Sequence, residues 1–124
     1  AELVKTVREQ NVTGFAGVPP LWNQVVRMLD RAPMLMPSLR LITNTGGKIP
    51  PDILERMPKV FPGVDIYLMY GLTEAFRSTY LDPALVDLHP TSMGKAIPHA
   101  EILVIDDVGE VTAGGEEGEE PGGI

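Results

Sequence analysis

The pattern of apolar and polar positions divides most of the chain into helices that alternate with strands. In residues 2–10 the apolar side chains recur at helical spacing, which predicts a helix, and the apolar run 12–18 is typical of a buried strand. A second helix is expected to begin at the paired prolines 19 and 20, because proline suits a first helical turn. Its apolar stripe predicts the core-facing positions Leu21, Trp22, Val25, Val26 and Leu29.

The same alternation continues towards the C-terminus. Strands that alternate with helices predict an α/β fold, here with a mostly parallel sheet, flanking helices and a loop-rich and β-rich C-terminal part. In open parallel sheets, ligands gather beyond the carboxyl ends of the strands. The further predicted elements are a strand at 39–43, a helix from residue 50, strands at 64–69 and 101–106, and a loop-rich stretch over 70–100 with a short strand at 77–81.

Composition and charge narrow the class of protein. The 124 residues are 44% apolar, contain no cysteine and carry a net charge of −7. No apolar run approaches the roughly 20 residues that a membrane helix needs. The N-terminus has no signal-peptide pattern, so the cytoplasm is the expected compartment. No basic patch is evident, which argues against a nucleic-acid partner.

The acidic residues concentrate at the C-terminal end. Residues 101–124 hold eight of the 17 acidic residues and no lysine or arginine. We expect residues 1–107 to form part of a folded domain and residues 108–124 to be a mobile, glycine-rich and glutamate-rich end. Both ends look cut, which predicts a fragment of a longer protein. A cut sheet would expose strand edges through which copies could associate.

The sequence YGLTE at 70–74 follows the strand 64–69 and brings together unusual residue types. Tyr70 offers a flat face for a planar ring, and Gly71 permits a close backbone approach. Thr73 offers a hydroxyl group for a phosphate oxygen, and Glu74 offers a hard oxygen ligand for magnesium. These residues would suit a nucleotide, but a structural turn in which the tyrosine packs and the glutamate caps explains them equally well.

A second glycine-containing loop, TGGK at 45–48, follows the strand 39–43. It does not match the GxxxxGK[ST] phosphate loop, because position 42 is isoleucine and Ile49 follows the lysine. Two glycines at a strand end would let a ligand lie against bare backbone. A tight turn before a proline-initiated helix is an equally good interpretation.

Taken together, these sequences resemble one family. VTGFAGVPPLW, TGG, YGLTE, SMGKAIPHAEILVID and GEEGE occur in the order and spacing of the adenylate-forming ligases, which include AMP-forming acyl-CoA synthetases, peptide-synthetase adenylation domains and luciferases. The phrases LMYGLTEAFRSTYL and MGKAIPHAEILVID most resemble bacterial acyl-CoA ligases associated with exosortase and exopolysaccharide gene clusters. The resemblance implies an enzyme that activates a carboxylic acid with ATP and magnesium, forms an acyl-adenylate and transfers the acyl group to coenzyme A.

The resemblance also implies roles for individual residues. Tyr70 would stack on adenine, Thr73 would contact the AMP phosphate and Glu74 would hold magnesium, so Thr73 and Glu74 would be the catalytic pair. Gly46, Gly47 and Lys48 would supply backbone beside the adenine and the acyl pocket, and Gly71 and Leu72 would edge the acyl-binding side.

The chain also departs from the family pattern. A glycine-rich phosphate loop ending in Pro-Lys-Gly, a ribose-binding aspartate and the lysine of a small C-terminal domain are all absent from the sequence. We therefore expect this polypeptide to be inactive on its own. Three alternatives remain at this stage: an amino-acid-adenylating domain that loads a carrier-protein thiol, a nucleotide-binding module without catalysis, and an α/β interaction domain.

Overall fold

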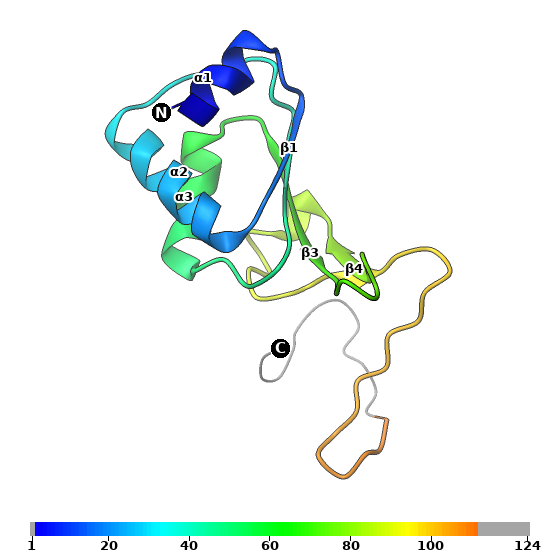
Figure 1. Cartoon of the computed structure of the whole chain (residues 1–124). Helices are drawn as coiled ribbons and strands as arrows, with labels where there is room; N and C mark the ends of the chain where they lie inside the picture. The colour runs from blue at the N-terminus through cyan, green and yellow to red at the C-terminus, as the bar shows by residue number, and fades with distance from the viewer. Residues whose placement is uncertain (1, 112–124) are drawn as a thin grey trace.

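The computed structural model describes residues 2–111, which begin as a body of helices packed on a sheet and end in an extended segment (Figure 1). The prolines initiate helices as the sequence predicts, since Pro19 and Pro51 are the first residues of α2 and α3. The elements in chain order are α1 (Glu2–Glu9), β1 (Gly14–Gly17), α2 (Pro19–Arg31), β2 (Leu41–Asn44), α3 (Pro51–Val60), β3 (Asp65–Tyr70), β4 (Thr79–Leu81), the 3₁₀ helix η1 (Pro83–Leu85) and β5 (Lys95–Ala96).

The five strands form one sheet in the order β1-β2-β3-β4-β5. The first three strands are parallel, while β4 and β5 join the sheet antiparallel, so the sheet is mixed. The α/β class is thereby confirmed, together with the parallel βαβ part that the sequence predicts. Strand β5 is a two-residue element that the apolar pattern does not indicate.

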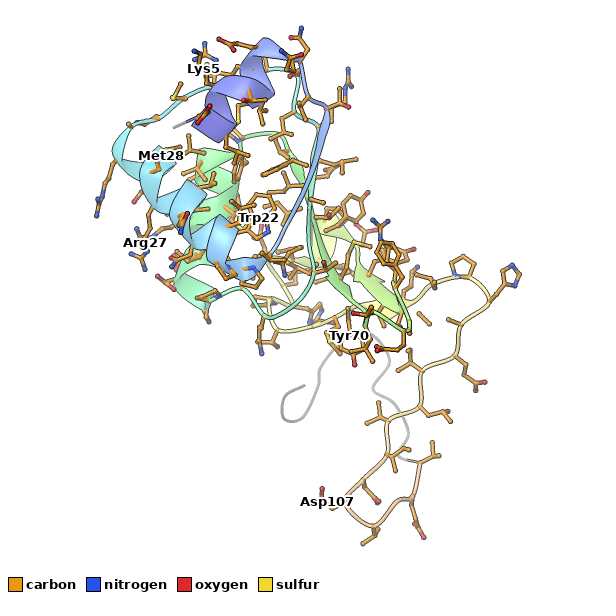
Figure 2. The ribbon with its side chains drawn as sticks, in the orientation of Figure 1. Lys5, Trp22, Arg27, Met28, Tyr70 and Asp107 are labelled. Atoms are coloured by element: carbon orange, nitrogen blue, oxygen red, sulfur yellow. The ribbon has the colours of Figure 1, made fainter. Side chains whose placement is uncertain are left out.

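Two expectations about strands are wrong. The run 12–18 does not form a buried strand, because β1 lies at the edge of the sheet and its residues alternate between exposed and half-buried. The run 101–106 forms no strand; its residues are exposed, and its one bridge pairs Ile105 with Val111. Asp107 lies far from the helices in this extended segment (Figure 2). The expected mobile end at 108–124 falls outside the described residues from 112 onwards.

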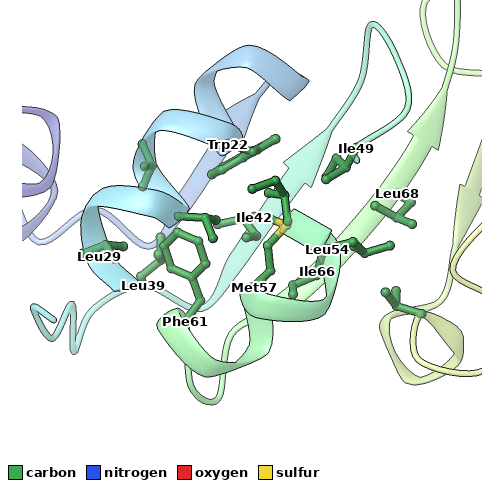
Figure 3. Close-up of a cluster of buried hydrophobic side chains, with 14 of the residues drawn as sticks. Trp22, Leu29, Leu39, Ile42, Ile49, Leu54, Met57, Phe61, Ile66 and Leu68 are labelled. Carbon is green, nitrogen blue, oxygen red and sulfur yellow. The ribbon is translucent and has the colours of Figure 1, made fainter. Parts of the chain in front are cut away.

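The helices α2 and α3 cover one face of the sheet, and the hydrophobic core lies between these helices and the sheet (Figure 3). Trp22 of α2 is completely buried, as predicted, and its ring packs edge-on against Phe15 at 5.2 Å and Phe61 at 6.1 Å between ring centroids. Gly17 permits this packing, because a Cβ there would lie 2.6 Å from the indole ring. No helix among residues 2–111 is long and apolar enough to cross a lipid bilayer.

Candidate functional site

The two loops that the sequence singles out lie side by side at one edge of the sheet. Strands β2 and β3 are parallel neighbours, with Asn44 opposite Leu68, so the loop 45–48 and the loop 71–78 leave the sheet at the same edge. Figure 2 places Tyr70, the last residue of β3, at this edge, away from α1. The parallel pairing of β2 and β3 therefore brings the two loops together.

A cavity of about 420 Å³ lies between these loops. Its lining is largely apolar and includes the buried side chains of Ile49, Leu54 and Leu68. A largely apolar lining with a few polar groups is typical of a pocket for an organic ligand. Six residues of the predicted site line this cavity: Gly46, Gly47, Lys48, Tyr70, Gly71 and Leu72.

The segment 90–93 completes the lining of the cavity. None of these four residues is a predicted site residue, although the SMGK sequence that contributes to the family resemblance overlaps this segment. Gly94 determines where the segment 90–93 lies, because Gly94 has a φ of +78° and a Cβ there would overlap the carbonyl oxygen of Tyr80. Only glycine lets β5 approach β4 this closely, and this approach sets the path of the preceding residues.

The loop 45–48 has a conformation that its two glycines make accessible. Gly46 has a φ of +79° and Gly47 a φ of +152°, values that residues with a side chain rarely adopt. The amide of Thr45 donates to the carbonyl oxygen of Gly17 at 3.2 Å, and Nδ2 of Asn44 donates to the carbonyl oxygen of Gly47 at 2.9 Å. Asn44 also lines the cavity, although no sequence motif marks it as a site residue.

The loop after β3 folds back on itself. The amide of Leu72 donates to the carbonyl oxygen of Ala75 at 2.9 Å, and the amide of Ser78 donates to the carbonyl oxygen of Tyr70 at 2.8 Å. A Cβ at Gly71 would overlap the carbonyl oxygen of Phe76, so the turn requires glycine there. The glycine of YGLTE thus has a structural reason that is independent of any ligand.

Thr73 and Glu74 lie near the turn of this loop and not in the cavity wall. Both residues are exposed, and neither side chain makes a hydrogen bond or an ion pair with the residues that the structure describes. Their functional groups are therefore available to a ligand that extends from the cavity towards the loop. The structure brings six of the eight predicted residues together in the cavity lining and leaves these two outside it.

The site holds few groups that could bind a metal ion. Within residues 2–111 no three histidine or acidic side chains cluster closely enough to form a metal site. A site built from protein ligands alone is thus not present in this part of the chain. Magnesium typically takes one or two carboxylates together with phosphate oxygens and water. The unpaired carboxylate of Glu74 fits this requirement when a phosphate group accompanies the ion.

Comparison with known proteins assigns the chain to a family. The family model of the AMP-binding enzymes matches residues 1–120, so the chain belongs to that family. It is 30% identical over 117 residues to the long-chain-fatty-acid–CoA ligase of Salmonella typhimurium, an alignment that covers 94% of this chain and 21% of that ligase. The chain thus spans about a fifth of the length of this curated relative.

Solved structures agree with this assignment. The crystal structure of VinN matches with a TM-score of 0.79 and 32% identity over 92% of this chain and 29% of VinN. The o-succinylbenzoate CoA synthetase of Bacillus subtilis, in complex with its acyl-adenylate intermediate, matches with a TM-score of 0.76 and 25% identity over 95% of this chain and 23% of that enzyme. The α/β fold described above is therefore a portion of the fold of adenylate-forming enzymes.

Proposed function

We propose that these residues form part of an AMP-forming acyl-CoA ligase and that the cavity between the two loops is its nucleotide and acyl site. The observation that carries the proposal is the convergence of TGGK and YGLTE on one cavity in a chain of the AMP-binding enzyme family. A nucleotide-binding module without catalysis or an interaction domain would not account for the similarity to ligases along the chain.

In the proposed reaction a carboxylate oxygen of the acid attacks the α-phosphorus of ATP, and the bond to pyrophosphate breaks. The half-buried ring of Tyr70 would provide a stacking face for adenine. The glycine backbone at 46 and 47 would allow the nucleotide to approach closely. The hydroxyl group of Thr73 would donate to a phosphate oxygen, and the carboxylate of Glu74 would hold magnesium. When bound, magnesium offsets the negative charge that develops on the departing pyrophosphate.

In the second half-reaction a thiol attacks the acyl carbonyl carbon and AMP leaves. We favour coenzyme A as the thiol over a carrier protein, because the Salmonella and Bacillus relatives are named as coenzyme A ligases or synthetases. Gly71 and Leu72 would border the acyl group, which suits the largely apolar lining of the cavity. We propose the cytoplasm as its compartment, because ATP, magnesium and coenzyme A are all supplied there.

The test uses the full-length protein that contains these residues. With ATP, magnesium and a panel of fatty and aryl acids, we expect acid-dependent exchange of pyrophosphate into ATP. Adding coenzyme A should then yield the acyl thioester and AMP. Exchange without thioester formation, combined with loading of a carrier-protein thiol, would favour the amino-acid-adenylating alternative. A protein that binds ATP but shows no exchange with any acid would contradict the proposal.

A further inference from the structure

Asn44 is a polar residue in a row of apolar side chains. It is the last residue of β2, on the face of the sheet that α2 and α3 cover, and only 3% of it is exposed. The other buried residue of β2 is Ile42, and the residue opposite Asn44 on the neighbouring strand β3 is Leu68. A buried amide is destabilising unless its polar atoms are hydrogen-bonded, so this position calls for a specific reason.

The two polar atoms of the Asn44 side chain differ in their partners. Nδ2 donates to the carbonyl oxygen of Gly47, whereas Oδ1 is buried and has no hydrogen-bond partner among the residues that the structure describes. The orientation of the amide follows from chemistry, because a carbonyl oxygen only accepts and must therefore face the nitrogen. An isosteric apolar side chain would remove the unpaired oxygen, so Asn44 is not the residue that stability alone would favour.

Asn44 restrains the conformation of the glycine loop. Gly46 and Gly47 carry no side chains, and glycine gives the backbone many accessible conformations. Within residues 2–111, Asn44 supplies the one side-chain hydrogen bond to this loop. The same side chain lines the cavity that the loop borders.

We infer that Asn44 is a positioning residue for ATP: through its bond to the Gly47 carbonyl it holds the 46–47 backbone in the shape against which the nucleotide binds. The inference rests on the proposed function, and it adds a residue that the family resemblance does not assign. A loop that is already ordered before binding loses less conformational entropy when the nucleotide arrives. The effect of Asn44 should therefore fall on the affinity for ATP and not on the chemical step.

The test is Asn44→Leu in the full-length protein. Leucine has a similar size and removes both the bond to Gly47 and the unpaired oxygen. We expect the melting temperature to stay the same or rise, while KM for ATP rises about tenfold, as the loss of one hydrogen bond allows. The rate at saturating ATP and KM for the acid should change by less than about threefold. A purely structural role predicts the opposite result, a lower melting temperature with an unchanged KM.

Ile42→Val is the matched control. It alters the preceding buried position of the same strand, and we expect a lower melting temperature with an unchanged KM for ATP. If Asn44→Leu does not fold, Asn44→Ser provides the same measurement, because the serine side chain is too short to reach the Gly47 carbonyl. An unchanged KM for ATP in a folded Asn44 variant overturns the inference. A wild-type protein without acid-dependent exchange refutes the proposed function instead.

Discussion

At the scale of single residues, Glu74 separates the functional interpretation of YGLTE from the structural one. Its carboxylate is exposed and unpaired within residues 2–111, so no fold interaction in this part of the chain depends on its charge. A glutamate that served only to stabilise the turn would have a partner there. The charge is therefore free to bind a cation, and its removal should alter catalysis without altering the fold.

We predict that Glu74→Gln lowers acid-dependent ATP–pyrophosphate exchange by about 10²–10³ in the full-length protein. Glutamine keeps the size and one acceptor oxygen but loses the charge that would hold magnesium against the phosphates. Exchange measured over a range of magnesium concentrations checks this prediction. Glu55→Gln, at an exposed position of α3, is the control and should exchange as the wild type does. Wild-type exchange by Glu74→Gln at ordinary magnesium would mean that Glu74 is a turn residue.

Tyr70 should respond differently, because stacking is present before and during the reaction. We predict that Tyr70→Ala mainly raises KM for ATP, by about 10- to 100-fold, since a base–aromatic stack contributes roughly 1–3 kcal/mol. Tyr70→Phe retains the ring and should keep KM close to the wild-type value. Steady-state kinetics at varied ATP distinguish the two variants. If both raise KM equally, the hydroxyl group and not the ring face is what matters.

Residues of the candidate site could be predicted from the sequence where several unusual residue types occur together. TGGK and YGLTE indicated six residues that the structure brings to one cavity. Asn44 gave no such signal, because one polar residue at the end of an apolar strand also fits a satisfied core position. The role that we infer for it depends on which backbone group its amide reaches and which atom stays unpaired, and only the three-dimensional structure reveals both.

At the scale of elements, local periodicity predicted the helices well and the strands less well. An amphipathic helix such as α2 satisfies its own backbone, so its sequence is sufficient to indicate it. A strand requires a partner, and a run of apolar residues does not say whether one is available. Within the part of the chain that the structure describes, residues 101–106 have strand-like composition but form no ladder, and β1 has a neighbouring strand on one side only.

The turn after β3 allows a direct test at this scale. We predict that Gly71→Ala displaces the loop 71–78, because the added Cβ would overlap the carbonyl oxygen of Phe76 and backbone atoms cannot move aside cheaply. The expected result is a loss of about 1–3 kcal/mol in stability together with reduced exchange activity. Chemical denaturation and the exchange assay measure these quantities.

Gly14→Ala is the matched control for this substitution. A Cβ at Gly14 would meet Leu41 at 3.5 Å, which is an ordinary van der Waals contact. Its stability should change by less than about 0.5 kcal/mol. Equal effects of the two substitutions would mean that the overlap at Gly71 is relieved by a small loop movement and does not constrain the YGLTE turn.

At the scale of the whole molecule, the sheet is protected unevenly. Among residues 2–111, two helices cover one face, whereas β1 is an edge strand whose one hydrogen-bonded neighbour is β2. Leu41, beside β1, is 39% exposed. An unprotected edge strand offers unpaired amide and carbonyl groups to another chain. The 124-residue polypeptide by itself therefore has a surface suited to pairing with a second copy.

We predict that the isolated 124-residue polypeptide associates in a concentration-dependent way and that Ala16→Lys reduces this association. Ala16 is an exposed residue of β1, and a lysine on an edge strand disfavours pairing with another chain. Light scattering coupled to size-exclusion chromatography measures the mass at several concentrations. Thr6→Lys, at an exposed position of α1, adds the same charge away from the edge and should leave association unchanged. Equal masses for the two variants would argue against an edge-mediated contact.

The same polypeptide should have no ligase activity, because the charges that adenylation requires are incomplete in it. The triphosphate of ATP carries several negative charges, and its transfer chemistry depends on preorganised positive groups and metal ions around the phosphates. Of the described residues that line the cavity, Lys48 is the one with a cationic side chain, and the phosphate loop and lysine that the family resemblance implies are absent from the sequence. With ATP, magnesium, coenzyme A and a panel of acids, pyrophosphate release should equal that of a heat-inactivated sample, while the full-length protein serves as the active control. Release well above the heat-inactivated level would show that these residues suffice for adenylation, and the role that we assign to the missing groups would then be wrong.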